Sequence, residues 1–179
     1  MQCNIRHAVS MSILTLALSV SSALSAADQP ITDCDRLAAH PWDPQKSSEG
    51  VFWNMMRTEQ AVEACNAAVG RDPSARNMYQ YGRALAKSKQ YEAAAFWYRR
   101  AGNLGYAQAQ FAMGDAYEFG EGVPRNEVAA GDWYQRAVEQ GHVHASAKLS
   151  RVLHASSTAV AHQVKRSNDA IAVNISGEL

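Results

Sequence analysis

The sequence predicts an all-α fold in which helix pairs stack into a short right-handed α-solenoid with a disulfide-tied N-terminal cap. One observation is a repeat, because the pair Trp97-Tyr98 recurs 36 residues later as Trp133-Tyr134. Another is that small and large apolar residues around each aromatic pair recur at i, i+3/i+4 and i+7, which is one face of a helix. A single helix pair cannot bury such a face alone, so the units must stack on each other.

The N-terminal residues 1–27 have the order typical of a secretory signal peptide. They contain one basic residue, Arg6, no acidic residue, and an apolar run over 11–20 that is followed by small residues up to Ala27. The run is too short to span a bilayer. We therefore expect cleavage near Ala26 or Ala27 and a periplasmic or secreted protein; a buried N-terminal helix is the alternative.

The charge of the remaining chain argues against nucleic acid as a partner. Removing Arg6 from the 17 basic residues leaves 16, against 17 acidic residues. Nucleic-acid binding is driven by neutralising phosphates, and a near-neutral chain is poorly suited to it. No second apolar segment is long enough to span a membrane. The oligomeric state stays open.

Two cysteines remain after signal cleavage, Cys34 and Cys65. An even count in an exported chain predicts one disulfide, with two buried free thiols as the alternative. The segment 28–59 around Cys34 is irregular, with a short helix expected near its start, then a turn-rich connector and one further helical turn. The disulfide would tie this segment to the following helix as a cap over the end of the stack.

Close packing of helices explains the residue types found in the repeat region, 60–156. Gly82 corresponds to Gly114, and in each case the glycine lets the second helix of the pair approach closely. The positions expected to shape the pairs are Gly82, Ala94, Trp97, Tyr98, Ala101, Gly114, Tyr117, Gly120, Gly122, Ala130, Trp133, Tyr134, Ala137 and Gly141.

These residues carry a family resemblance. The stretch 109–145 resembles a Sel1-like repeat, with mild departures at Met113, Asn126 and Val138, and the preceding 75–108 is closer to a tetratricopeptide repeat because it is four residues shorter. The resemblance implies an α-solenoid in an exported bacterial protein that does scaffold or regulatory work.

The stretch "YEFGEGVPRN" has two glycines before a helix, as phosphate-binding loops do. It follows a helix rather than a strand, so we interpret it as the joint of a helix pair. Gly120 and Gly122 are expected at positive φ, Val123 should reach the seam, and Pro124 and Asn126 should start the next helix.

The C-terminal part starts a third unit without completing it. Residues 142–156 supply one more first helix, but no Trp-Tyr helix follows. Residues 157–179 are only weakly periodic and are expected to form a short helix and then a partly disordered tail.

The chain has no HExxH, CxxC, GxSxG or P-loop motif, the patterns typical of common catalytic and nucleotide-binding sites. We therefore predict no enzyme, no cofactor and no metal site. His142, His144 and His154 are the residues closest to a metal set. Side chains at i and i+2 diverge on a helix, so solvated histidines are the simpler interpretation.

The first helix of each pair should line a concave groove. The residues expected to face it are Arg76, Tyr79, Arg83, Lys87, Phe111, Asp115, Glu118 and Arg151. Aromatic residues with arginine are typical of binding hot spots, although solvated helix faces would show the same pattern.

The predicted function is a non-catalytic, exported protein–protein interaction module that binds a peptide or protein segment in this groove. Two alternatives remain: an enzyme or binding protein that acts on cell-wall material related to β-lactams or peptidoglycan, and a structural subunit that is stable only with a partner.

Overall fold

The computed structural model describes residues 31–176, except the side chains of residue 159 and of residues 167–176. The predicted signal peptide, 1–27, lies outside the described residues. Within them, the structure contains helices and connecting loops and no strand, which confirms the all-α fold.

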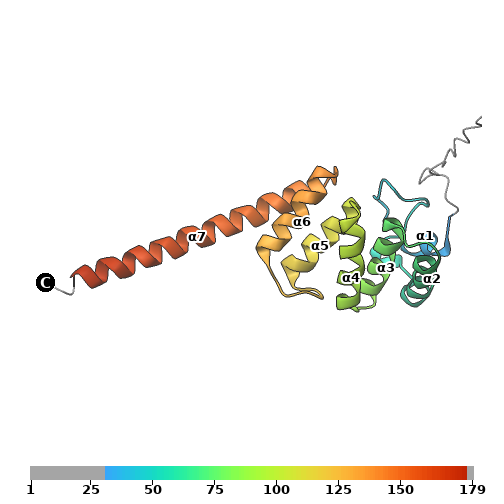
Figure 1. Ribbon diagram of the computed structural model, residues 1–179, viewed down its shortest axis with the longest axis horizontal. Coiled ribbons are helices and arrows are strands. Elements are labelled where there is room, and N and C mark those ends of the chain that lie inside the picture. The colour runs from blue at the N-terminus through green and yellow to red at the C-terminus, as the bar shows by residue number, and fades with distance from the viewer. Residues whose placement is uncertain (1–30, 177–179) are drawn as a thin grey trace, which may run out of the picture.

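The helices follow one another in a row (Figure 1). Their bounds are α1 Asp33–Ala38, the 3₁₀ turn η2 Trp53–Met55, α2 Thr58–Arg71, α3 Ala75–Lys87, α4 Tyr91–Asn103, α5 Ala107–Phe119, α6 Glu127–Glu139 and α7 Ala145–Ser176. From α2 to α7 each helix packs against the next, and α1 packs against both α2 and α3. The predicted stack of helix pairs is therefore present.

Each pair is closed by a glycine that faces a tyrosine ring. A Cβ at Gly82 would lie 2.7 Å from the ring of Tyr98, and one at Gly114 would lie 2.3 Å from the ring of Tyr134. Real Cβ atoms do not approach other atoms so closely, so only glycine fits at both positions. The predicted close packing of glycine and aromatic residue is confirmed.

The α5–α6 joint has the predicted geometry. Gly120 ends α5 at φ +75° and Gly122 has φ +71°, where a Cβ would meet the carbonyl oxygen of Tyr91 at 2.1 Å. Val123 packs against the main apolar core. The side chain of Asn126 accepts a hydrogen bond from the backbone N–H of Ala129 and caps α6.

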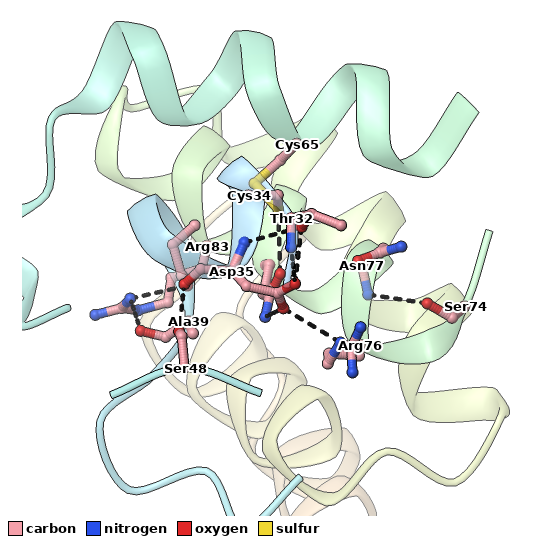
Figure 2. The surroundings of a disulfide bond; sticks show 12 residues. Thr32, Cys34, Asp35, Ala39, Ser48, Cys65, Ser74, Arg76, Asn77 and Arg83 are labelled. Carbon is pink, nitrogen blue, oxygen red and sulfur yellow. Dashed lines mark hydrogen bonds and ion pairs between the residues drawn. A yellow bond between two sulfur atoms is a disulfide. The ribbon is translucent and has the colours of Figure 1, made fainter. Parts of the chain in front are cut away.

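The N-terminal cap is held by its own capping box and by the disulfide. Thr32 and Asp35 cap each other's backbone at the start of α1. Cys34 and Cys65 are joined, with 4.6 Å between their Cα atoms, and both are buried. The predicted disulfide thus ties α1 to α2 (Figure 2).

The C-terminal segment differs from the expectation. Instead of a short helix and a tail, α7 continues without interruption to Ser176 and projects well beyond the stack (Figure 1). The physical reason is composition, since no glycine or proline occurs between Ala145 and Ser176. Among the described residues, no helix is both long enough and apolar enough to cross a membrane.

Candidate interaction groove

The candidate site is a cavity of about 260 Å³, which we call the groove. It lies where α3 and α5 meet the non-helical segment 39–53 and the turn between α6 and α7. Its lining residues are His40, Trp42, Trp53, Tyr79, Arg83, Tyr98, Gln108, Phe111, Ala112, Asp115, His142, Val143 and His144. Four of the residues predicted from the sequence are among them, namely Tyr79, Arg83, Phe111 and Asp115.

Arg83 holds the N-terminal segment against the stack. Its guanidinium donates hydrogen bonds to the carbonyl oxygens of Ala38 and Ala39, each at 3.0 Å, and of Val51 at 2.5 Å (Figure 2). The side chain is only 3% exposed, and burial lowers its pKa. Arg83 was predicted to face the groove; it lines the groove, but its guanidinium is bonded to the cap.

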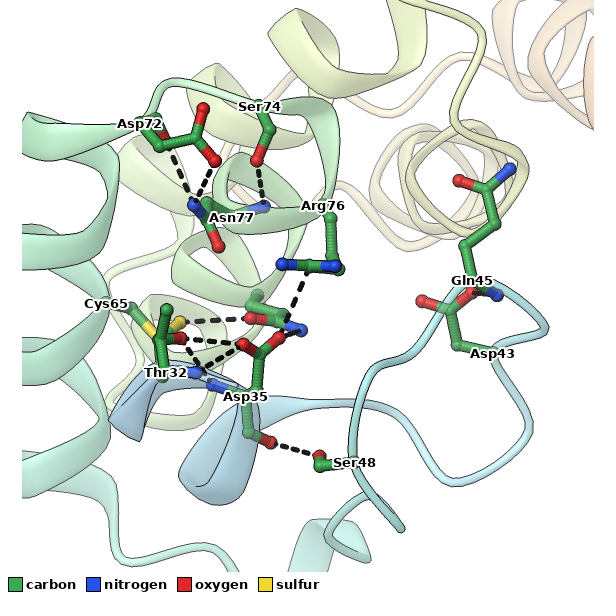
Figure 3. Close-up of polar contacts among 12 residues, drawn as sticks. Thr32, Asp35, Asp43, Gln45, Ser48, Cys65, Asp72, Ser74, Arg76 and Asn77 are labelled. Atoms are coloured by element: carbon green, nitrogen blue, oxygen red, sulfur yellow. Dashed lines mark hydrogen bonds and ion pairs between the residues drawn. A yellow bond between two sulfur atoms is a disulfide. The ribbon is translucent and has the colours of Figure 1, made fainter. Parts of the chain in front are cut away.

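Arg76 has a similar internal role. Its Nε lies 3.3 Å from Oδ1 of the fully buried Asp35, which also accepts a hydrogen bond from Gln80 at 3.0 Å (Figure 3). Burial raises the pKa of Asp35, but hydrogen bonds from Gln80 and Thr32 outweigh it and bring the pKa below its usual value. Arg76 is 7% exposed and fixes the cap, so its predicted place in an open groove is corrected.

The segment 39–53 is also anchored to α5. The hydroxyl of Tyr106 donates a hydrogen bond to the buried Asp43, and the pKa of Asp43 is raised by burial (Figure 3 shows Asp43 on its loop). The side-chain amide of Gln108 reaches the carbonyl oxygen of Trp42 at 3.5 Å. This segment therefore lies across both repeats and forms one wall of the groove.

Aromatic rings form the floor. Tyr79 is buried, with its ring centroid 5.4 Å from that of Tyr106, and burial raises the pKa of its hydroxyl, which therefore stays protonated. Phe111 stacks on the ring of His142 with 4.3 Å between centroids. Tyr79 and Phe111, the two aromatic residues predicted to face the groove, both line it.

The acidic residues of the second unit are neutralised inside the molecule. Lys148 Nζ lies 2.6 Å from Asp115 Oδ1, and the Tyr134 hydroxyl oxygen lies 2.7 Å from Asp115 and 2.6 Å from Glu118, so its single proton can be donated to either carboxylate. Arg151 completes the set through an ion pair with Glu118. Burial raises the pKa of Glu118, but the contacts with Tyr134, Lys148 and Arg151 lower it by more. The pKa of Glu118 is therefore below its usual value. Glu118 and Arg151 were expected to face the groove; the structure corrects this and places them in an α5–α7 contact in which Glu118 is buried and Arg151 is exposed.

Lys87, which was predicted to face the groove, is not among its lining residues, but lies on the last turn of α3 next to the lining residue Trp53. Its Nζ is 5.3 Å from the centroid of the Trp53 ring, a cation–π contact. Lys87 and Arg83 thus both approach Trp53, whose ring centroid is 5.9 Å from the Arg83 Cζ.

Several lining residues escaped the sequence analysis. His40, Trp42 and Trp53 come from the irregular segment between the two cysteines, where no helical period assigns a face. The signal available in the sequence was the presence of two tryptophans in a polar connector, which is unusual. In the structure Trp42 is 65% exposed and Trp53 is 47% exposed. His142 was expected to be solvated and is instead buried, which corrects that expectation.

The half-buried His40 and the buried His142 are both neutral at pH 7. Burial, followed by the charge of Arg83, lowers the pKa of His40 to about 4. Burial, followed by the charge of His144, lowers the pKa of His142. Among the residues that the structure describes, no group of three or more His, Cys, Asp or Glu side chains could hold a metal ion. The groove offers aromatic surface with cations at one end, which suits recognition of a chain segment.

Comparison with known families agrees with this architecture. The family model described as Sel1 repeat matches residues 65–106 and 107–142, which span α2 to α6. Residues 65–142 are therefore similar to two consecutive Sel1 repeats. The segment 75–108, which resembled a tetratricopeptide repeat more closely, falls within these two matches.

The chain is also similar to a curated fungal protein, the chitin synthase regulator SKT5 of Malassezia restricta. The two are 46% identical over 57 residues, which are 32% of this chain. This chain spans only 4% of the length of that protein. No solved structure matches the chain.

Proposed function

We propose that the protein is a non-catalytic interaction module that holds a peptide or protein segment in the groove. The observation that carries the proposal is the concentration of exposed aromatic side chains around a concave cavity. Trp42, Phe52 and Trp53 all lie at its wall or in the adjoining 330 Å³ cavity, and each is about half exposed or more. Large apolar residues gathered at a cavity mark a contact surface more often than a solvated one.

The two comparisons support this role. Sel1 repeats generally mediate contacts between proteins, and the fungal relative is named as a regulator. Neither observation identifies a partner. We place the work of the protein outside the cytoplasm, because residues 1–27 have the order of a signal peptide and because structural disulfides persist in oxidising compartments.

Site-specific photocrosslinking tests the groove. A photoreactive amino acid placed at Trp53 should capture a partner in the cells that make the protein, whereas the same amino acid at Leu104 should not. Leu104 is a matched control, since it is exposed and lies in the α4–α5 turn outside the groove. A synthetic peptide of the captured segment should then bind the purified protein, and Trp42→Ala should abolish that binding.

The proposal fails if both positions capture the same proteins in equal amounts, or if the captured peptide binds the Trp42→Ala protein normally. Export has its own test. The mature protein isolated from outside the cytoplasm should begin near residue 27 or 28, and a retained residue 1–27 segment would contradict it.

A further inference from the structure

We infer that the end of the groove beside Trp53 binds an acidic peptide segment in which a carboxylate lies next to a large apolar side chain. This inference rests on the proposed function and adds the chemistry of the partner. We call the cations and rings at this end, Trp42, Trp53, Arg83 and Lys87, the tryptophan corner.

Charge is unevenly distributed along the groove. The acidic residues of α5 and the basic residues of α7 cancel each other. Asp115 and Glu118 are paired with Lys148 and Arg151, as described above. Asp115 is the acidic side chain that lines the groove, and it is already neutralised by a lysine.

The two cations beside Trp53 have no such compensation, although Arg76 on the same helix is paired with Asp35. Among the side chains that the structure describes, neither Arg83 nor Lys87 has a carboxylate at ion-pairing distance. Arg83 is bonded to neutral carbonyl oxygens, so its positive charge persists inside the fold. The lowered pKa of His40, to which the charge of Arg83 contributes, agrees with a positive potential at this end. An anionic group is therefore the complementary occupant.

Apolar surface surrounds this end of the groove. Trp42 and Phe52 meet edge to face with 6.1 Å between ring centroids, and Trp53 stands between the groove and the adjoining cavity. The rings lower the local dielectric constant beside the two cations, which strengthens an ion pair made there. They also offer a place for an apolar side chain next to the carboxylate. A ligand with only a charge would contact the cations and not the rings, and a ligand with only apolar surface would contact the rings and not the cations.

The two cations differ in how available they are to a ligand. Arg83 is engaged with the cap, so it supplies a fixed charge rather than a mobile donor. Lys87 is half-buried and its Nζ lies over the face of Trp53, a contact that a carboxylate can replace or extend. We therefore assign the direct ion pair to Lys87 Nζ, and the long-range attraction to Arg83.

Selection from a random heptapeptide library displayed on phage tests the inference on the full, disulfide-bonded protein. Enriched peptides should carry Asp or Glu within two residues of Trp, Phe, Leu or Met. Lys87→Glu should weaken binding of the selected peptides at least about tenfold, and Lys87→Gln should give a smaller loss. Arg71→Glu is the matched control, since Arg71 is an exposed cation on α2, away from the groove, and should leave binding unchanged.

The outcomes separate the two proposals. Enriched peptides that are neutral or basic, yet lose binding in Trp42→Ala, would overturn the acidic partner and leave the interaction groove standing. If the selected peptides bind the Lys87→Glu protein as well as the native protein, the acidic partner is likewise overturned and the interaction groove still stands. No enrichment, or enrichment that is independent of Trp42, would overturn both. Circular dichroism of each variant at 222 nm establishes that a lost signal is not lost folding.

Discussion

Single glycines set how closely the helices of each pair approach. At Gly114 the ring of Tyr134 occupies the space of a side chain, and at Gly82 the ring of Tyr98 does the same. Gly70 on α2 is different, because a Cβ there would meet nothing within 4 Å. Substitution of glycine by alanine should therefore change the stability of the fold in opposite directions at Gly114 and at Gly70.

Gly114→Ala should destabilise the protein by about 1–3 kcal/mol, because the tyrosine ring must move to admit the methyl group. Gly70→Ala should stabilise it by about 0.5–1 kcal/mol, because alanine removes backbone entropy from the unfolded chain at no steric cost. Urea unfolding followed by circular dichroism measures both. Equal effects of the two variants would contradict the role given to Gly114.

His40 is the residue that should make stability depend on pH. Its pKa falls from 6.5 in the unfolded chain to about 4 in the fold. Between these values the unfolded chain binds more protons, so stability is full above pH 6.5 and is lost as the pH falls toward 4. Since the ring is partly exposed, the loss attributable to it should be roughly 1–2 kcal/mol.

The test compares urea midpoints at pH 7.5 and pH 4.5 in the native protein and in His40→Gln. The variant should lose less stability across this interval, although His142, whose pKa is also lowered, leaves part of the dependence in place. An unchanged slope in His40→Gln would mean that the ring does not stay neutral in the fold.

At the scale of elements, α7 combines two parts with different roles. Near its start it packs on α6, where Val152 is buried against Ala130 and Tyr134 and Lys148 joins the acidic pair on α5. Farther along, every described side chain from Ser157 onward is exposed. The first part closes the end of the stack, and the second projects beyond it (Figure 1).

Deleting residues 159–179 should therefore leave the free energy of unfolding within about 0.5 kcal/mol of the native value, while the helical signal falls. Deleting residues 152–179 should cost about 1–3 kcal/mol, because Val152 is removed from the core. Thermal and urea unfolding of the two truncated proteins make the comparison. A large loss from the shorter deletion would show that the projecting helix has a partner, for example a second copy of the chain.

At the scale of the whole molecule, the disulfide couples the cap to the groove. The 31-residue separation between Cys34 and Cys65 encloses the segment that carries Trp42 and Trp53. Asp35, Arg76, Gln80 and Arg83 add buried polar contacts between this segment and α3. Loss of the disulfide should thus affect binding as well as stability.

The double variant Cys34→Ala, Cys65→Ala should lose roughly 3–4 kcal/mol of stability, since the unfolded chain is no longer constrained. It should also bind groove peptides weakly, because one wall of the groove is no longer tied to the stack. Limited proteolysis should cut within 39–57 in the variant before it cuts α3–α6. Equal protection of the segment in both proteins would show that the polar contacts alone are enough to hold it.

The repeat determined the fold from the sequence alone. A glycine at one position and an aromatic residue at its matching position leave one way to pack a helix pair, so Gly82, Gly114, Tyr98 and Tyr134 were identified correctly. The helix joint at Gly120 and the pairing of the two cysteines also followed from local chemistry. These features depend on nearby residues or on a simple count, and such information survives in a one-dimensional sequence.

The site was decided by tertiary structure. Helical period predicts which face of α3 points inward, but not that an irregular segment folds over that face and buries Arg76 and Arg83. A segment without a period has no predictable direction, so Trp42 and Trp53 entered the groove only through long-range contacts with α3 and α5. Long-range contacts also decide which charges in the groove are neutralised, since Asp115 is paired with Lys148, 33 positions further along the chain. The sequence by itself therefore determined the scaffold, and the tertiary structure decided which surface of it is free to bind.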